Sequence, residues 1–507
     1  MADEVRRYTF GPLERRGVIV GLQAVQLVTL GAGVMVALAA ARAFPGPSGS
    51  ILAAVVAMGS LAGSFWTMHG RPSASWVAVL GAWVGRRTTE PRLSPSPTGG
   101  RRAARCPGSG VIAVSEGQAG SVCHDVPAGI GLSTVPGRPG QLPFGLVHDR
   151  HHGTWAAVVP VQGRSFALLD PEDKVRRLDG WGALLAALAR PGSPLRRVQW
   201  VERSAPGDPG SLARDFTARL PAGSPTAGPA LAGATPGDVA RASYAGLVSG
   251  AAPATHDHQV WLVLAVPAPR RSLPGRPGPP GGGGNRAVEA LARELRLLDG
   301  QLRSADLAAG PPLDVASLRV LLAPVAPPPV AGNGSAPGPR WPLASDEAWS
   351  AWRADGSWHA TYWVAEWPRL EVGPDFLAPL LLSGGRRAVS LTMAPVAPGR
   401  AAREAVAART ADLADEELRS RAGFVPTARR RREADGVTRR EAELADGHAE
   451  LRFSGYVTVS APSRAALEEA CAEAEHAAQA SHLEVRRLYG RQAEAFTWTL
   501  PLGRGLT

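Results

Sequence analysis

Two long apolar runs near the N-terminus are the strongest feature of the hydrophobic pattern. They extend from Gly17 to Ala41 and from Ser50 to Met68, and a short connector rich in proline and glycine separates them. Neither run contains an ionised side chain. An α-helix needs about 20 apolar residues to cross the hydrocarbon core of a bilayer. The pattern therefore predicts a transmembrane helical hairpin, with a secretory signal peptide or two buried soluble helices as the alternatives.

Arginines on either side of the two runs predict the orientation of this hairpin. The connector carries only Arg42, whereas the flanks carry many more arginines, at positions 6, 7, 15 and 16 before the first run and at 71, 86, 87, 92, 101, 102 and 105 after the second. Cationic residues are enriched on the cytoplasmic side of membrane proteins. We therefore expect a protein of the cytoplasmic (inner) membrane with both termini in the cytoplasm.

Four residues inside the hairpin are candidates for helix packing. Gln23 and Gln26 lie three positions apart on one helical face, and Gly59 and Gly63 form a GxxxG pattern. Small residues let helices approach closely in lipid, and amides hydrogen-bond between helices. These residues either pack the hairpin on itself or contact another membrane subunit.

A short helix is expected directly after the hairpin, within residues 72–85. Trp76 and Trp83 lie on one face of it, together with Leu80, and Arg86 and Arg87 follow. Tryptophan and arginine are enriched at the headgroup layer. We interpret Trp76, Trp83, Arg86 and Arg87 as an interfacial anchor.

The remainder alternates between strand-like and helical patterns, which predicts an α+β protein. Two cytoplasmic α/β domains of ferredoxin-like, βαβ type are expected after the hairpin. Strands are expected at 154–161, 165–169, 196–203, 259–267, 358–366, 387–395, 451–460 and 483–488, and helices at 171–189, 236–249, 286–299, 313–323, 375–382, 400–418 and 463–480. The expected organisation is 1–87 for the hairpin with its interfacial helix, 88–107 for a linker, 108–268 for a first domain, 269–342 for Pro/Gly-rich loops around helices and 343–507 for a second domain.

Composition narrows the classes of function only slightly. The net charge is +11, and it comes almost wholly from arginine, since Lys174 is the only lysine. The composition, rich in Ala, Gly, Pro and Arg, indicates codon bias in a GC-rich genome more than nucleic-acid binding. Three cysteines at 106, 123 and 471 lack metal-ligand spacing and predict no disulfide framework.

No motif for catalysis, for a metal or for a cofactor stands out. A P-loop needs GxxxxGK followed by Ser or Thr, and Lys174 has no such glycine cradle. His148, His151 and His152, with His124 upstream, are the nearest approach to a zinc cluster, but they are expected in a polar turn. The His256-Asp257-His258 stretch has the same interpretation. We therefore expect no enzyme, no metal and no cofactor.

The N-terminal part resembles a known family. The block YTFGPLERRG at 8–17, the hairpin, the HGRP stretch at 69–72 and Trp76 are similar to PrgI-type membrane proteins of actinobacterial conjugation-like gene clusters. The same family carries segments similar to VHDR at 147–150, RSFALL at 164–169 and QWVER at 199–203. The resemblance implies a membrane subunit of a type IV secretion apparatus.

The C-terminal part resembles the N-terminal accessory domain of VirB/TraG-class secretion ATPases. The resemblance is carried by YWVAEWPR at 362–369, DFLAPLL at 375–381, GYVTV at 455–459 and PLG at 501–503. It implies an adaptor whose ATPase motor is on another polypeptide, together with a polytopic channel subunit. The candidate partner surface on this domain consists of Tyr362, Trp363, Trp367 and Phe376.

Two other functions remain open from the sequence. EccE-type components of type VII secretion also have two N-terminal spans and a cytoplasmic domain. A membrane-tethered nucleic-acid-binding protein is the alternative from another class, because tryptophans at 341, 349, 352, 358, 363 and 367 are dense enough for a stacking platform. Core and interface packing is the favoured interpretation of these tryptophans, which disfavours direct nucleic-acid binding.

Overall fold

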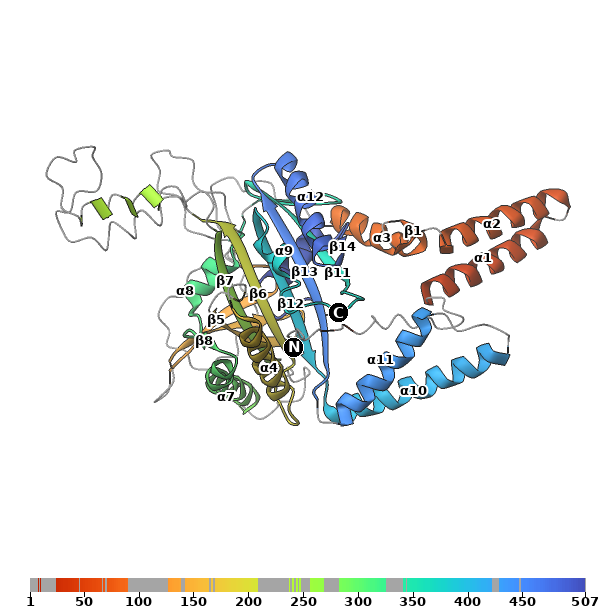
Figure 1. Cartoon of the computed structure of the whole chain (residues 1–507). Coiled ribbons are helices and arrows are strands. Elements are labelled where there is room, and N and C mark those ends of the chain that lie inside the picture. The colour runs from red at the N-terminus through yellow and green to blue at the C-terminus, as the bar shows by residue number, and fades with distance from the viewer. Residues whose placement is uncertain are drawn as a thin grey trace.

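The computed structural model consists of an apolar helical hairpin and a mixed α/β region built on one large antiparallel sheet (Figure 1). It describes residues 8, 10, 24–44, 46–65, 67–68, 71–89, 126–137, 142–163, 166, 169–207, 237, 239–240, 243–244, 246–247, 256–268, 282–324, 341–342, 344–421, 428–445 and 448–506. All structural statements below concern these residues.

The two predicted apolar helices are present and form a hairpin. They are α1 (Ala24–Ala43) and α2 (Pro47–Phe65), and both are long and apolar enough to cross a membrane. Val28 is 71% exposed and Met35 is 69% exposed. Large apolar side chains of a soluble helix normally face a core, so their exposure along a hairpin that projects from the sheet (Figure 1) is consistent with lipid contact.

Close contact within the hairpin involves residues other than the predicted glycine pair. A Cβ atom on Gly33 would lie 2.3 Å from the Cβ of Ser60, so the helices approach most closely there. Gln26 donates from Nε2 to the carbonyl of Ser64 at 2.9 Å, which connects the two helices. Cβ atoms on Gly59 and Gly63 would meet no atom within 4 Å.

A short link joins the hairpin to the sheet. It comprises β1 (Thr67–Met68), β2 (Arg71–Pro72) and α3 (Ser73–Thr89). In Figure 1, α3 lies between the hairpin and the sheet. Along the chain, α3 is therefore the described helix that follows the hairpin and lies against the sheet region.

The sheet has twelve strands in the order β3-β4-β5-β7-β6-β12-β13-β11-β10-β9, with β8 paired to β5 and β14 paired to β11. The ladders are antiparallel throughout the described strands. Their bounds are β3 Ile130–Val135, β4 Phe144–Asp149, β5 Thr154–Gly163, β6 Arg197–Pro206, β7 His256–Pro267, β8 Leu307–Ala309, β9 Ser345–Glu347, β10 Trp352–Ala354, β11 Ser357–Glu366, β12 Arg386–Pro395, β13 Leu451–Ala461 and β14 Glu484–Arg487.

The same arrangement of elements occurs twice in this sheet. In the first half, the chain runs β5-α4-β6-β7-α7-β8, and the strands lie in the order β8-β5-β7-β6. In the second half, it runs β11-α9-β12-β13-α12-β14 with the arm α10–α11 inserted after β12, and the order is β14-β11-β13-β12. The halves meet where β6 pairs with β12, from Arg387 opposite Ser204 to Met393 opposite Val198.

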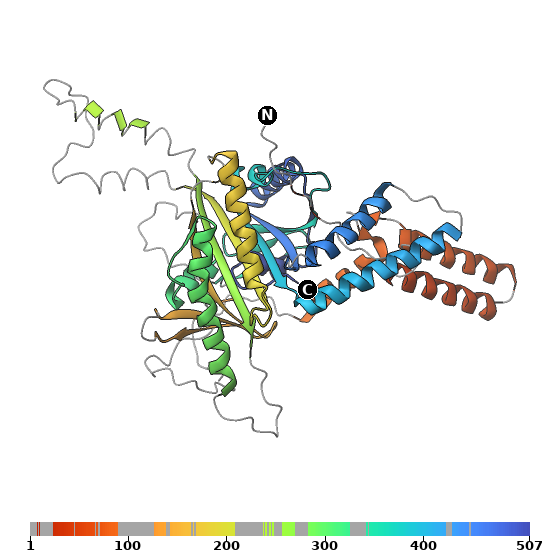
Figure 2. The same cartoon turned by 60° about the horizontal axis from the view of Figure 1, so that its bottom comes forward.

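Helices cover both faces of the sheet. One face carries α4 (Pro171–Leu188), α7 (Gly282–Ser304), α9 (Ala378–Leu382) and α12 (Arg464–Ala480), and α4 and α7 are seen along it in Figure 2. The other face carries α8 (Val315–Leu322), α13 (Gln492–Phe496), the 3-10 turn η3 (Thr497–Thr499) and the segment 500–506. Both faces of the sheet are therefore buried.

Local sequence signals account for several helix starts. Ser463 accepts a hydrogen bond from the Ala466 amide at 3.2 Å, and Asp314 accepts one from Ser317 at 2.8 Å. Such side chains satisfy amides that have no partner within the helix. Pro171, which needs no amide partner, starts α4.

Two long connections leave the sheet at opposite ends. The residues 207–255 follow β6, and the arm formed by α10 (Pro398–Arg421) and α11 (Ala428–Ala445) follows β12. Because β6 and β12 are antiparallel neighbours, their C-terminal ends point in opposite directions. Figures 1 and 2 both place α10 and α11 on the side of α1 and α2, and the helical residues between 237 and 247 on the opposite side.

Most of the expected strands and helices are present close to their predicted bounds, but the strand expected at 165–169 is not. Of these residues the structure describes Phe166 and Leu169, both of which lie outside strands, and β5 pairs with β4, β7 and β8. The strands of the two expected domains form one continuous sheet. The domain boundaries at 268 and 343 stay a prediction.

Candidate functional site

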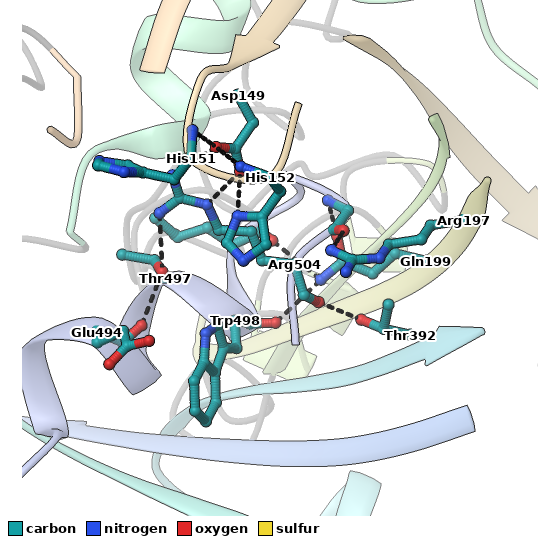
Figure 3. A network of polar contacts seen from close by, with 12 residues as sticks. Asp149, His151, His152, Arg197, Gln199, Thr392, Glu494, Thr497, Trp498 and Arg504 are labelled. Atoms are coloured by element: carbon teal, nitrogen blue, oxygen red, sulfur yellow. Dashed lines mark hydrogen bonds and ion pairs between the residues drawn. The ribbon is translucent and has the colours of Figure 1, made fainter. Parts of the chain in front are cut away.

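Two places in the structure bring together side chains that are distant in sequence. The first, called the joint below, lies where α3 meets the sheet and consists of Trp76, Trp83, Arg86, Glu347, Trp349, Tyr489 and Gly490. The second, called the seam, lies beneath the segment 500–506 and centres on Gln199, Asp149 and Arg504 (Figure 3).

Aromatic rings form the centre of the joint. The ring of Trp349 lies 5.7 Å from that of Trp76 and 5.5 Å from that of Trp83, between centroids. Tyr489 completes the group at 5.8 Å from Trp76 and 6.1 Å from Trp349. Tilted and edge-on aromatic pairs at such distances contribute about 0.5–1.5 kcal/mol each beyond the area they bury. The predicted anchor tryptophans thus contact aromatic residues of the sheet region.

An arginine and a glycine fix the geometry of the joint. Arg86 donates to the carbonyl of Gly490, and its Nε lies 3.7 Å from Oε2 of Glu347. Gly490 has a φ of +70°, and a Cβ there would lie 2.7 Å from the ring of Trp349. Glycine is required here because a side chain would be strained and would displace the tryptophan.

The joint also connects to the segment that covers the sheet. Oε1 of Glu347 accepts a hydrogen bond from the amide of Ala493 at 3.0 Å, at the start of α13. Arg86, on the membrane side, and α13 are therefore held by the same carboxylate. Arg87, the other arginine of the predicted interfacial anchor, also lies in α3.

A second attachment involves the N-terminal segment. Tyr8 and Val372 form a bridge with backbone hydrogen bonds of 2.9 and 3.0 Å. The ring of Phe10 lies 5.3 Å from both Trp367 and Phe376. The chain's own N-terminal segment therefore contacts two residues of the predicted partner surface.

The other two residues of that predicted surface have different surroundings. Tyr362 is 2% exposed and lies in the core of the second half, where its hydroxyl donates to Glu475 at 2.8 Å. Trp363 is half-buried and donates to Oγ of Ser454 at 3.1 Å. Tyr362 therefore offers no surface to a partner, which corrects that part of the prediction.

Among the predicted membrane-packing residues, Gln26 bonds within the hairpin, as described above. Gln23 lies outside the described residues. Gly59 and Gly63 have open space at their Cβ positions, and their role in packing stays a prediction.

The seam is organised by Gln199 of β6. This side chain is fully buried, and its Nε2 is close to three acceptors, Oγ of Ser390 at 2.8 Å and the carbonyls of Trp498 and Leu500 at 2.9 and 3.0 Å. Its Oε1 accepts from the Gly503 amide at 2.7 Å. One amide group thus joins both halves of the sheet to the segment 500–506.

Neighbouring polar groups hold the same segment (Figure 3). Arg197 donates to the carbonyls of Gly503 at 3.0 Å and Leu506 at 2.7 Å. Thr392 donates to the Arg504 carbonyl at 2.6 Å, and the Tyr456 hydroxyl donates to that of Gly505. Buried backbone carbonyls are costly without a partner, so these side chains are what allow the segment to cross the sheet.

A buried ion pair connects the seam to the first half of the sheet region. Arg504 contacts the two carboxylate oxygens of Asp149 at 2.5 and 3.1 Å, and His152 shares that carboxylate through Nδ1 at 2.9 Å. Burial alone would raise the pKa of Asp149. The hydrogen bonds from His152 and Arg504, together with the Arg504 charge, outweigh burial and hold this pKa well below its usual value.

A buried histidine lies nearby, on the second half. His359 is fully buried between the rings of Trp352 and Phe496, with its Nδ1 2.8 Å from Oγ of Ser460. Burial, with a smaller contribution from the charge of Arg203, lowers its pKa to about 3. His359 is therefore neutral at physiological pH.

Of the histidines considered as zinc ligands, His151 and His152 lie in the turn after β4, where both bind Asp149. His148 lies in β4 with Nε2 2.5 Å from Oγ of Ser133, and His258 lies in β7 with Nδ1 2.9 Å from Glu202. The expectation that the His256–His258 stretch is a turn is wrong, since it begins β7. Among the described residues, no three His, Cys, Asp or Glu side chains are grouped to hold a metal ion.

The comparisons with known proteins add no relative. A scan against protein-family models found no match, and a search of curated proteins found none.

The joint and the seam both fix segments of backbone. Gln199, Glu347 and Arg504 were missed from the sequence because their partners lie far away along the chain.

Replacement of Gln199 by leucine is expected to destabilise the protein. The change removes the partner of the Trp498 carbonyl and of the Gly503 amide, while the Leu500 carbonyl keeps its bond from the Leu502 amide, and the loss costs about 2–4 kcal/mol in free energy of unfolding. Gln162→Leu, at an exposed position of β5, is the matched control and should have little effect. Thermal unfolding of the full chain in detergent measures both, and equal midpoints would contradict the role of Gln199.

Replacement of Trp349 by alanine is expected to open the joint. Loss of its aromatic contacts should accelerate tryptic cleavage after Arg86 by about tenfold or more, because the cut requires local opening. Trp358→Ala removes a half-buried tryptophan elsewhere and should leave the cleavage rate unchanged. Quantification of the two fragments over time provides the measurement, and identical rates for the variants would reject the joint as the attachment.

His359 is expected to make stability depend on pH. Below pH 6.5, its usual pKa, the unfolded chain binds a proton that the folded protein excludes. Stability conferred by the neutral histidine is complete above that pH and falls by about 1.4 kcal/mol per pH unit toward pH 3. His359→Gln should remove this slope and exposed His476→Gln should not. Denaturant titrations between about pH 4 and 7 test this, and an unchanged slope in His359→Gln would disprove it.

Proposed function

We propose that this protein is a non-enzymatic structural adaptor of a conjugation-like type IV secretion apparatus in the cytoplasmic membrane. In this role, the hairpin anchors the chain with both termini in the cytoplasm, and the sheet region docks a separate ATPase. A polytopic channel subunit is the second expected partner. The proposal rests on the resemblance of the two parts of the chain to PrgI-type proteins and to ATPase accessory domains.

The observation that supports it most is the joint. Membrane-side residues Trp76, Trp83 and Arg86 are held by Trp349, Glu347 and the Gly490 carbonyl of the sheet region. A scaffold has to hold its partner at a fixed position relative to the membrane. A sheet attached to a hairpin by such contacts suits this purpose. An enzyme would instead need convergent catalytic groups.

The two halves of the sheet support a finer proposal about the fold. Each half has the element order β-α-β-β-α-β, and in each the fourth strand lies beside the first and the third between the first and the second. This is the order of ferredoxin-like units. We therefore interpret the sheet region as two ferredoxin-like units joined edge to edge.

The alternatives differ in their partners. An EccE-type subunit of type VII secretion would share the hairpin and a cytoplasmic domain. A nucleic-acid-binding role has less support, because Trp352 is buried and stacks on Trp341 at 5.8 Å instead of offering a free ring.

Affinity purification of the tagged full chain from membranes, with mass spectrometry, tests the proposal. We expect a VirB-class ATPase and a polytopic channel protein to co-purify. Trp367→Ala should reduce recovery of the ATPase several-fold, while Trp358→Ala, a tryptophan outside the predicted surface, should not. Gel filtration verifies that both variants fold.

Each other outcome decides against this assignment. Recovery of an FtsK-like motor would favour the alternative assignment, an EccE-type subunit of type VII secretion. Absence of any P-loop ATPase would reject the adaptor role.

A further inference from the structure

The two edges of the sheet differ in length and charge. At the edge beside the joint, β9 has three residues, two of which are Asp346 and Glu347. At the other edge, β3 has six residues, Ile130–Val135, and none of them is charged or a proline. Proteins commonly protect a sheet edge with a short strand, charges, prolines or a bulge. The ladder between β3 and β4 also has no shift of register, so β3 has neither charge, proline nor bulge.

Hydrogen bonds at the two ends of β4 show how this ladder alternates. Arg150 donates its amide to the Gly129 carbonyl at 3.0 Å, so this pair bonds across the ladder. The Gly145 amide instead turns away from β3 and donates to the Leu313 carbonyl at 2.7 Å. Bonded and non-bonded pairs alternate along an antiparallel ladder. The odd-numbered residues of β3 therefore bond to β4, and the even-numbered residues direct their main-chain groups away from it.

Two even-numbered residues present these main-chain groups at the open edge. Leu132 and Thr134 are both in non-bonded positions of the ladder. No described residue accepts a hydrogen bond from their amides or donates one to their carbonyls. The amide of Ile130, in contrast, donates to the Pro127 carbonyl at 3.0 Å. An added strand would therefore find two donors and two acceptors, at Leu132 and Thr134.

Apolar side chains lie beside this edge. Leu132 packs against the core cluster that includes Leu318 of α8, and Val135 packs against the core on the opposite face of the sheet. Leu142, two residues before β4, is 64% exposed. In strand addition, main-chain hydrogen bonds give affinity and alternate side chains give specificity. An extended segment with alternating apolar side chains fits such an edge.

The place of β3 in the sheet decides against a second copy of this chain as the occupant. The joint lies at the other end of the strand order, beside β10 and β14, about 40 Å from β3 at roughly 4.8 Å for each strand. Figure 1 shows α1 and α2 beyond the side of β11 and β14, with β5 and β8 on the other side. Two-fold pairing of β3 with its copy would place the two hairpins at opposite ends of one sheet, where they could not enter the same bilayer.

The size of the contact also favours an extended segment over a folded copy. A stable interface between two folded proteins buries roughly 1,200 Å² or more. A single ladder along the six residues of β3 is smaller than this. Strand addition needs less area, because its affinity comes from main-chain hydrogen bonds at an edge that is already ordered.

We propose that the open edge of β3 binds an extended segment of a cytoplasmic partner protein, which joins the sheet as a further strand beside Leu132 and Thr134. The segment alternates apolar side chains, in keeping with the uncharged strand that it pairs with. The sheet then has its membrane attachment at one edge and this partner at the other. The inference requires α1 and α2 to be in a bilayer with the sheet region in the cytoplasm, but it does not depend on the secretion-system assignment.

Peptide binding to the full chain in nanodiscs tests this proposal. The probe is a dye-labelled peptide, Glu-Val-Thr-Val-Thr-Val-Glu, blocked at both ends. Leu132→Pro removes the outward amide without removing a bond to β4, because proline has no N–H and is tolerated on edge strands. Leu132→Val keeps that amide and is the matched control. Fluorescence anisotropy measures the dissociation constants, and circular dichroism verifies that both variants fold.

We expect the peptide to bind the unchanged chain and Leu132→Val alike, and to bind Leu132→Pro more weakly by about tenfold or more. Hydrogen exchange at residue resolution gives an independent readout. In the free chain, the amides of Leu132 and Thr134 should exchange rapidly and those of Gly131 and Ser133 slowly, since the latter bond to β4. The peptide should slow exchange at Leu132 and Thr134 and leave Gly131 and Ser133 unchanged.

Four outcomes would overturn the proposal. No binding of the peptide, or equal binding to Leu132→Pro, would show that the edge does not accept a strand. Slow exchange at Leu132 and Thr134 without peptide would mean that another segment of this chain occupies the edge. A dimer that Leu132→Pro dissociates would identify a second copy instead. Failure to recover an ATPase in the purification above changes none of these readouts, so the two proposals fail independently.

Discussion

The ladder between β6 and β12 is the contact on which the rest of the sheet region depends. Each of these strands is the outer strand of its own half, and pairing them satisfies edge groups that would otherwise be open to aggregation. Gln199 and Ser390 face each other across this ladder at 2.8 Å, beneath the segment 500–506. Because the same amide also binds Trp498, Leu500 and Gly503, the position of that segment and the junction of the halves are established together.

The antiparallel junction has a consequence for the whole molecule. The C-terminal ends of β6 and β12 point in opposite directions, so α10 and α11 lie on the side of the hairpin and the described helical residues between 237 and 247 lie on the opposite side. Attachment to the hairpin comes from elsewhere, through α3 and the rings of Trp76, Trp83 and Trp349. Glu347 connects this attachment to α13 and therefore to the seam.

Several elements could be predicted because their signals are local. The apolar runs predicted the hairpin helices, Ser463 predicted the start of α12, and alternation predicted β6, β12 and β13 near their observed bounds. The prediction of a strand at 165–169 was wrong. A short apolar run beside a glycine turn has the local pattern of a hairpin strand, whether or not it pairs with a neighbouring strand. The aromatic signal at Trp76 and Trp83 was interpreted as lipid contact, since a sequence pattern cannot distinguish a headgroup layer from the aromatic rings of another segment.

By itself, the sequence determined the apolar hairpin, the alternation of strands and helices and the sorting of charge along the chain. These properties depend on residues within one or two turns of each other, where periodicity and capping act. Only the tertiary structure decided the order of the strands, the pairing of β6 with β12 and the partners of Gln199, Arg86 and Arg504. Asp149 and Arg504, for instance, are 355 residues apart. Such pairs form because the fold excludes water around them, so that each buried polar group needs partners within the protein, and no local pattern of residues encodes which partners those are.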